Sequence, residues 1–140
     1  MARGRHTVAL LGDGDFAMGA SALWTAVRHR IPLLILILIL INNNRSYFND
    51  ELHQETVAKR RNRNPSNRWI GQRMADPEPD LAKLAEAQGA LGIGPVRSSK
   101  EVADAITRGV AALKQGRVAV IDLHIDAERV ERTVGHRPTG

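Results

Sequence analysis

The chain has 140 residues and a formal net charge of +5, with 25% charged and 43% hydrophobic residues. Its length fits one domain that buries roughly two-thirds of its unfolded surface. The chain has no cysteine, which excludes disulfides, thiolate catalysis and cysteine-ligated metals. The basic charge raises the question of nucleic acid, but aromatic residues make up only 4%. A stacking surface for single strands is therefore not expected, and an enzyme that handles anionic ligands is the preferred explanation.

Two apolar segments invite a targeting or membrane interpretation, and both are too short. The basic residues 1–6 precede only a brief apolar run at 8–11, so no secretory signal is expected. The nine apolar residues 33–41 lie between Pro32 and three asparagines, whereas a membrane helix needs about 20. We expect a cytoplasmic protein.

The first half of the chain predicts a strand–helix–strand unit. Residues 7–11 are an apolar run that ends in Gly-Asp-Gly, which is typical of a strand followed by a turn. Residues 16–30 have apolar positions spaced along one helix face, with Asp15 as the expected N-cap and Trp24 in the core. The run at 33–41 is apolar on both faces, which predicts a central strand of a parallel sheet.

The second half continues the alternation of helices and strands. We predict a helix at 50–61, a polar loop at 62–76 and a helix at 80–88 that ends near Gly89. A weak strand at 90–96 precedes a helix at 98–116, which a Ser98–Glu101 capping box opens. A strand at 117–125 and a tail at 126–140 complete the chain. This order predicts an α/β fold: a three-layer, doubly wound, mainly parallel sheet. We expect one binding domain over 1–125 and a C-terminal tail over 126–140.

Oxygen-rich turns follow the first two predicted strands. Consecutive parallel strands end at the same edge of a sheet, where open α/β sheets bind ligands. Asp13 and an asparagine of 42–44 would then share a hard oxygen site for Mg²⁺ or Ca²⁺, completed by phosphate oxygens and water. Either turn alone would most simply be a tight turn without a ligand. Two such turns within one strand–helix–strand unit favour a metal–diphosphate site.

These turns resemble a known motif. Gly12-Asp13-Gly14 followed at a distance by Asn43-Asn44 is similar to the thiamine diphosphate (ThDP) motif of ThDP-dependent enzymes. Residues 9–18 and 43–51 resemble the acetolactate synthase and benzoylformate decarboxylase branch, and the likeness continues through 67–71 to the last strand. The resemblance implies the C-terminal, diphosphate-binding domain of such an enzyme, N-terminally truncated, with ThDP and Mg²⁺ as cofactors.

The resemblance implies three metal ligands: the carboxylate of Asp13, the amide oxygen of Asn44 and the backbone carbonyl of Ser46. It implies cofactor-binding positions at Gly12, Asp13, Gly14, Asp15, Phe16, Asn44, Ser46, Tyr47 and Phe48.

The chain departs from the family pattern in three ways. An alternative pairing of Asn42 with Asn43 would move the carbonyl ligand to Arg45. The apolar run at 33–41 is about four residues longer than we expect in relatives, and an even insertion keeps the side-chain alternation. Asp15 stands where relatives often have a small polar residue, and an acid beside a diphosphate is unfavourable unless it caps the helix and points away.

The family's catalytic glutamate belongs to a pyrimidine-binding domain that a partner subunit normally contributes. We therefore assign no catalytic residue here, and Glu51, Glu55, Glu78 and Glu86 are interpreted as surface acids. The chain is expected to be a fragment or a subunit, inactive alone. Its expected partners are the pyrimidine-binding domain, further copies in a homo-oligomer and a small 2-keto acid, without nucleic acid or membrane.

The resemblance favours an enzyme domain for cleaving or forming bonds next to a 2-keto group, as a decarboxylase or an acetolactate synthase. The alternative is a non-catalytic diphosphate-binding module that needs a partner. A third hypothesis is nucleic-acid binding through the basic loop at 59–73, for which a solvated loop is the preferred interpretation. His53 is expected on a helix surface, and Trp69 against a neighbouring domain.

Overall fold

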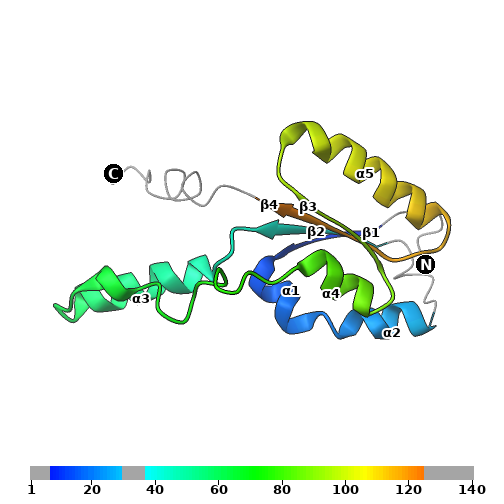
Figure 1. The fold of residues 1–140 in the computed structure, drawn as a ribbon. Coiled ribbons are helices and arrows are strands. Elements are labelled where there is room, and N and C mark those ends of the chain that lie inside the picture. Colours follow the sequence, from blue (N-terminus) through cyan, green and yellow to red (C-terminus); the bar gives the residue numbers. More distant parts are fainter. Residues whose placement is uncertain (1–6, 30–36, 125–140) are drawn as a thin grey trace.

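The computed structural model describes residues 7–29 and 37–124, which form a four-stranded parallel sheet with helices on both faces (Figure 1). The strands are β1 (Thr7–Gly12), β2 (Ile37–Asn43), β3 (Leu91–Val96) and β4 (Ala119–His124). Their order is β1-β2-β4-β3, and each pairing is parallel. Since β2 lies between β1 and β4, the prediction of a central strand from the apolar run is confirmed.

The helices complete a three-layer arrangement. They are α1 (Asp13–Gly19), α2 (Ala22–His29), α3 (Phe48–Arg60), α4 (Leu81–Ala87) and α5 (Ser99–Lys114), with a 3₁₀ turn η1 (Pro65–Asn67). Helices α1, α2 and α4 cover one face of the sheet and α5 covers the other (Figure 1). The predicted doubly wound α/β fold is confirmed.

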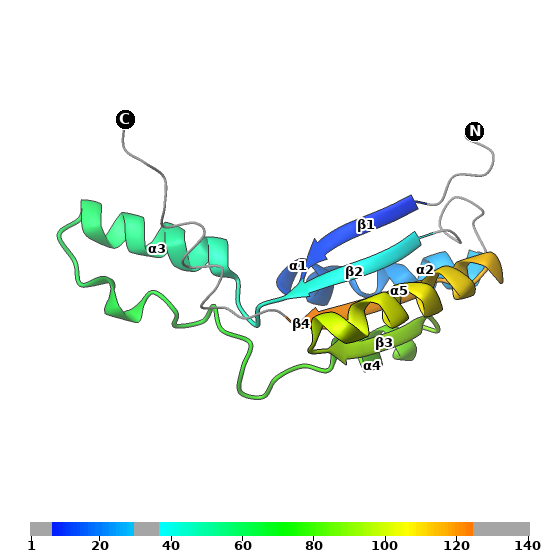
Figure 2. The ribbon, with the colours of Figure 1, turned by 90° about the horizontal axis from the view of Figure 1, so that it is seen from above.

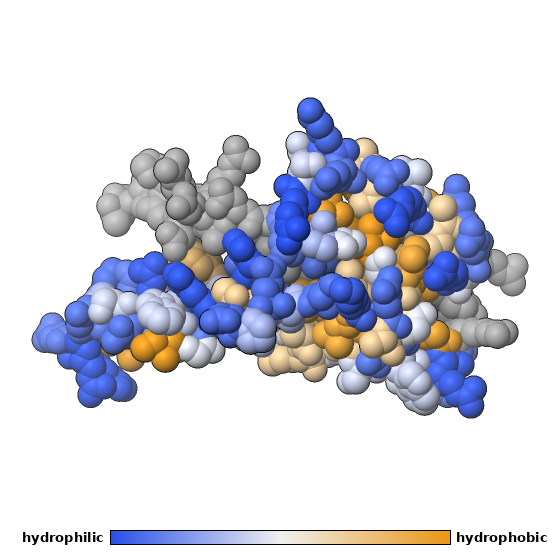
Figure 3. Space-filling view, viewed as in Figure 1, coloured by the Kyte–Doolittle hydropathy of each residue, from blue (hydrophilic) through white to orange (hydrophobic). Residues whose placement is uncertain are grey.

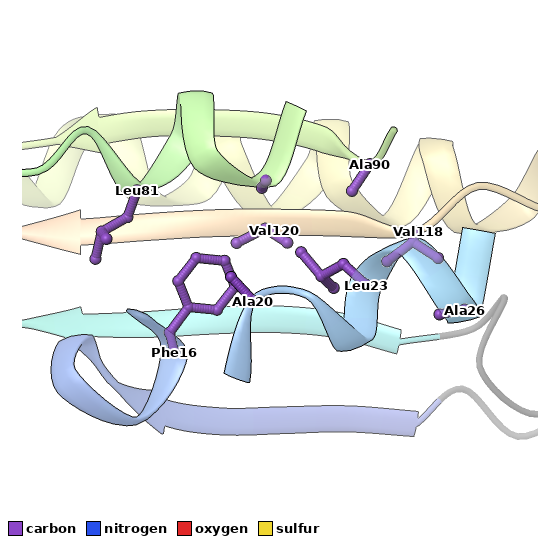
Figure 4. Close-up of a cluster of buried hydrophobic side chains, with 9 residues drawn as sticks. Phe16, Ala20, Leu23, Ala26, Leu81, Ala90, Val118 and Val120 are labelled. Atoms are coloured by element: carbon purple, nitrogen blue, oxygen red, sulfur yellow. The ribbon is translucent and has the colours of Figure 1, made fainter. Parts of the chain in front are cut away.

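Two hydrophobic clusters hold the layers together, one on each face of β4. Val118 and Val120 belong to the cluster beneath α1, α2 and α4, whereas Ala119 and Ile121 belong to the cluster beneath α5. This alternation follows from the two-residue period of a strand. Figure 4 shows the first cluster, in which the ring of Phe16 lies near Val120.

The predicted single helix over 16–30 is wrong, because the segment forms two helices. Helix α1 begins at Asp13, and its N-cap is Gly12 rather than Asp15, which lies exposed in the first turn. The amides of Leu23 and Trp24 donate to the carbonyls of Ala20 and Ser21, three residues back, at 3.0 and 3.2 Å. Gly19 and Ser21 are weaker helix formers than alanine, so a tight turn separates the helices there.

The expectation that Trp24 belongs to the core is also wrong. Its side chain is 55% exposed, whereas Leu23 and Ala26 are the buried residues of α2. Neighbouring helix positions point about 100° apart, so a residue next to Leu23 leaves the buried stripe.

Other predicted elements agree with the structure. Asp80 caps α4 by accepting a hydrogen bond from the Lys83 amide at 2.8 Å, and Gly89 follows the helix with φ +88°. Glu101 accepts the amide of Ser98 at 3.1 Å in the predicted capping box. β2 runs on through Asn43 instead of turning at Asn42. The predictions for residues 33–36 and for the tail at 126–140 lie outside the described residues.

Residues 48–74, which we call the arm, comprise α3, η1 and the return segment to Met74. The arm extends beyond the carboxyl ends of the strands, and α3 packs against η1 (Figures 1 and 2). Its surface is mostly hydrophilic (Figure 3). Within residues 7–29 and 37–124, none of the helices is both long and apolar enough to cross a membrane.

Candidate functional site

A cavity of about 340 Å³ opens at the carboxyl ends of β1 and β2. Gly12 pairs with Asn42 across the two strands, so the turns that follow them share one edge of the sheet. The cavity is lined by Gly12, Asp13, Gly14, Asp15, Asn44, Ser46, Tyr47, Phe48, Asn49 and Asp50. Its volume lies within the range of about 300–1,000 Å³ that is usual for small-molecule sites.

Asp13 is the buried carboxylate of this cavity, with 3% of its surface exposed. One oxygen, Oδ1, accepts the Gly14 amide at 2.9 Å, and the other, Oδ2, accepts the Ser46 amide at 3.1 Å. Burial raises the pKa of Asp13 above its usual value near 3.8, and these hydrogen bonds offset part of that effect. The charge of Asp13 is therefore incompletely compensated by the protein.

Asn44 is the first residue after β2, and its amide oxygen meets Asp13 at a shared donor. Asn44 Oδ1 accepts the Ser46 amide at 2.9 Å, and this is the amide that also donates to Asp13 Oδ2. Each oxygen keeps further lone pairs for another ligand. Asn42 and Asn43 belong to β2 itself.

The turn between β2 and α3 is held from the arm side. Arg45 has φ +60°, a left-handed conformation that is uncommon for a residue with a side chain. The Arg45 carbonyl accepts the Met74 amide at 2.9 Å, and the Gln72 carbonyl accepts the Tyr47 amide at 3.0 Å. The return segment of the arm thus stabilises a strained turn at the edge of the cavity.

The ring of Tyr47 packs directly on Gly14. A Cβ atom at Gly14 would lie 2.2 Å from Tyr47 Cε1 and 2.5 Å from Cδ1, far inside contact distance. Glycine is therefore the residue that fits this position of the acidic turn.

Most, but not all, of the expected cofactor-binding residues line the cavity. Phe16 does not, because it lies 2% exposed in the hydrophobic core beneath α1. Asn49 and Asp50 also line the cavity, although the sequence predicts no role for them. Their signal was their position directly after the asparagine motif.

Of the four glutamates interpreted as surface acids, Glu51 is buried, so the prediction for it is wrong. It is 2% exposed, and its Oε1 accepts a hydrogen bond from Ser46 Oγ. Glu78 and Glu86 are exposed as predicted, and Glu55 is partly buried. A glutamate in the first turn of a polar helix gives no sequence signal for burial, since burial here depends on arginines brought back by the arm.

The basic loop is partly neutralised by acids of α3. Lys59 pairs with Glu55, and Arg68 Nη1 lies 2.7 Å from Glu55 Oε2. The Trp69 ring is 45% exposed, with the Arg73 guanidinium 5.6 Å from its centroid. His53 is exposed on α3, as expected, and does not line the cavity.

The donors around the cavity suit a hard cation. In the described part of the chain, no three histidine, aspartate or glutamate side chains converge as a metal cluster. A metal here would use one carboxylate together with amide and carbonyl oxygens, which are ligands that Mg²⁺ accepts while keeping positions for phosphate oxygens and water.

Comparison with known protein families decides what kind of domain this is. The family described as thiamine pyrophosphate enzyme, C-terminal TPP binding domain, matches residues 1–123. The chain belongs to this family. It is a ThDP-binding domain, and the fold and the resemblance predicted from the two turns are confirmed.

Relatives of this ThDP-binding domain include enzymes of both expected types. The chain is 28% identical over 120 residues to an acetolactate synthase large subunit of Buchnera aphidicola subsp. Schlechtendalia chinensis, covering 86% of this chain and 19% of that protein. It is similar to the structure of a thiamine diphosphate-dependent 4-hydroxybenzoylformate decarboxylase of Rhodococcus jostii RHA1, with 26% identity and a TM-score of 0.56. That likeness covers 89% of this chain and 20% of the decarboxylase chain. The chain thus spans about a fifth of the length of either relative.

Proposed function

We propose that the cavity at the ends of β1 and β2 binds Mg²⁺ together with the diphosphate of ThDP. Asp13, Asn44 and the Ser46 carbonyl are the proposed protein ligands of the metal. The observation that carries this proposal is the convergence of Asp13 Oδ2 and Asn44 Oδ1 on the amide of Ser46, at 3.1 and 2.9 Å.

The chemistry of the donors supports a cation at this place. Burial raises the pKa of Asp13, so the surrounding protein disfavours the charge of this carboxylate. A divalent cation beside the carboxylate would favour the charged form and so offset the cost of burial. The donors are all oxygens, which suits Mg²⁺ better than softer metals.

Backbone geometry supports the register with Asn44 over the alternative with Asn42 and Asn43. In the alternative, the Arg45 carbonyl would serve as the third ligand, but it is directed toward the arm, where it accepts the Met74 amide at 2.9 Å. Asn42 and Asn43 also pair within the sheet, opposite Leu123 and His124 of β4. Asn44 is the first asparagine past the end of the strand.

We propose that this domain serves a decarboxylase or an acetolactate synthase-type enzyme acting on 2-keto acids. Bound ThDP would supply the electron sink for breaking or making bonds next to the keto group. The part of this chain is to hold the diphosphate through the metal and to place the Tyr47 and Phe48 side chains along the cavity. Relatives of both types support this class of reaction without choosing the substrate.

We also propose that the reaction needs a pyrimidine-binding domain from outside this chain, in a homo-oligomer or from another subunit. The chain spans about a fifth of its relatives. The described residues that line the cavity include aspartates but no glutamate to act as the family's catalytic base. The chain alone should therefore bind the cofactor without turning over 2-keto acids; turnover by the purified chain would contradict this.

The test of the proposed function is a calorimetric titration of the chain with ThDP in the presence of Mg²⁺ and again in EDTA. We expect binding in Mg²⁺ that is lost in EDTA and lost in Asp13→Ala. The control variant is Asp104→Ala, because Asp104 is exposed on α5 and far along the chain from the residues of the cavity. This variant should bind as the wild type does. Equal binding by wild type and Asp13→Ala would refute the proposal.

A further inference from the structure

Glu51 is a buried acid for which the proposed metal site gives no direct role. It is the only buried residue of α3, a helix that the structure describes in full. A carboxylate is costly to bury unless its charge is paired and its oxygens accept hydrogen bonds. The partners of Glu51 therefore indicate what its burial achieves.

Those partners come from two sides. On the cavity side, Ser46 Oγ donates a hydrogen bond to Glu51 Oε1. On the arm side, Arg73 Nε lies 3.7 Å from Oε1 and Arg68 Nε lies 3.8 Å from Oε2. One carboxylate thus joins the turn after β2 to two arginines of the returning arm.

Ser46 is the residue through which this contact reaches the site. Its amide is the donor shared by Asp13 and Asn44, and its carbonyl is the proposed third metal ligand. Its backbone also forms a bridge with Arg73, next to the hydrogen bonds that hold the strained Arg45. The side-chain bond to Glu51 therefore restrains the residue on which the site's hydrogen bonds converge.

We infer that Glu51 is a positioning residue, which couples the arm to the metal–diphosphate site by fixing Ser46. The inference rests on the proposed function, because it concerns the same site. Glu51 does not line the cavity, so it acts through Ser46 and not by contact with the cofactor. Arg68 and Arg73 pair with the carboxylate and hold it in place, so the geometry of the site depends on the arm being folded back (Figure 2).

The chain offers a matched control in Glu55, one turn further along α3. Glu55 also pairs with Arg68, through Nη1 at 2.7 Å, but Arg68 and Lys59, with which it pairs, are both on the arm, and it does not line the cavity. Loss of outer partners of metal ligands typically lowers affinity about 10–100-fold. We expect Glu51→Ala to weaken Mg²⁺–ThDP binding in that range, and Glu55→Ala to change it less than about threefold.

Two further variants separate positioning from a general loss of stability. Glu51→Gln keeps an oxygen that can accept the Ser46 hydroxyl, so it should recover part of the affinity lost in Glu51→Ala. Ser46→Ala removes the same hydrogen bond from the other side. We expect the double variant Ser46→Ala/Glu51→Ala to bind about as the weaker single variant does, because both changes remove one interaction.

A readout without the cofactor is amide hydrogen exchange of the peptide covering residues 44–48. Exchange there should be faster in Glu51→Ala than in Glu55→Ala, while exchange in β4 stays unchanged in both. If wild type binds Mg²⁺–ThDP and Asp13→Ala does not, yet Glu51→Ala matches Glu55→Ala in affinity and exchange, the role of Glu51 is refuted and the proposed function stands. If wild type does not bind, the proposed function itself fails, and the inference fails with it.

Discussion

Asp13 and Asn44 accept the same backbone N–H group, that of Ser46, at 3.1 and 2.9 Å. Asp13 directly follows β1 and Asn44 directly follows β2, so the parallel pairing of these strands brings them together. Because both oxygens accept the same N–H group, they border one point of the cavity, which is where we propose that the ion binds. The site therefore depends on sheet register as much as on the two side chains.

Gly14→Ala should destabilise the chain, because the new Cβ would lie 2.2 Å from Tyr47 Cε1. Overpacking of this kind costs about 1–3 kcal/mol. We expect a loss of that size in the free energy of unfolding by urea, together with weaker Mg²⁺–ThDP binding. Gly14→Ala/Tyr47→Ala, which removes the clash, should recover part of the stability.

Gly19 provides the control for that substitution. A Cβ at Gly19 would meet no atom within 4 Å, and the residue ends α1. Gly19→Ala should therefore be neutral or stabilising by about 0.4–1 kcal/mol. If Gly14→Ala proved as stable as Gly19→Ala, the packing of Tyr47 on Gly14 would be wrong.

Asp15→Asn should tighten the binding of Mg²⁺–ThDP. Asp15 is exposed, lines the cavity and does not cap α1, so its negative charge lies beside the region proposed for the diphosphate. Charges of the same sign near a solvated surface repel by roughly 1 kcal/mol or less, which corresponds to a several-fold gain in affinity at low salt. Calorimetry at two salt concentrations measures the effect. Weaker binding by the variant would instead make Asp15 a contributor to the metal site.

Substitutions at Phe16 test whether this residue contributes to the hydrophobic core or to cofactor binding. Because it is 2% exposed within the core, Phe16→Ala should cost about 3–5 kcal/mol of folding free energy. Phe16→Leu should cost only about 1 kcal/mol and leave the dissociation constant for Mg²⁺–ThDP unchanged. A Phe16→Leu variant with wild-type stability and lost cofactor binding would return Phe16 to the binding residues.

The N-cap of α4 should make the stability of the chain depend on pH in the acid range. The Lys83 amide donates to Asp80 and holds the pKa of that carboxyl below 3.8. A lowered pKa contributes stability above about pH 4 that is lost as the pH falls through the folded-state value. Asp80→Ala should lose about 1 kcal/mol at pH 7, the usual worth of an N-cap, and the difference from wild type should shrink below pH 4. Asp80→Asn should keep the cap at both pH values, and urea unfolding measures all three chains.

Much of the fold could be predicted because its elements have strong local signals. The run at 33–41 predicted an inner strand, and Asp80 and Glu101 marked helix starts that the structure confirms. The sequence does not predict the break between α1 and α2, because the apolar spacing continues across Gly19 and Ser21. The helical backbone is nevertheless interrupted there. Trp24 was misplaced for the same reason: the rotation of α2 about its own axis depends on that break.

The residues of the site that directly follow strands could be predicted from the sequence. The contacts made by segments that fold back from far along the chain could not. Asp13 and Asn44 follow strands, so topology alone brings them to one edge. The sequence predicts a surface acid at Glu51, which is wrong because its burial depends on Arg68 and Arg73, which the arm carries back from beyond α3. No periodicity in the sequence encodes that return.

The most direct test of the account is the dissociation constant of Mg²⁺–ThDP, measured by calorimetry for wild type, Asn44→Ala and Asn43→Ala. If Asn44 is the ligand that joins Asp13 at the metal, Asn44→Ala should weaken binding about 100-fold or more, exceeding the usual effect of outer partners. Asn43→Ala, which changes a residue of β2, should weaken it far less. The opposite ranking, with Asn43→Ala losing the cofactor and Asn44→Ala retaining it, would contradict the register on which the proposed site rests.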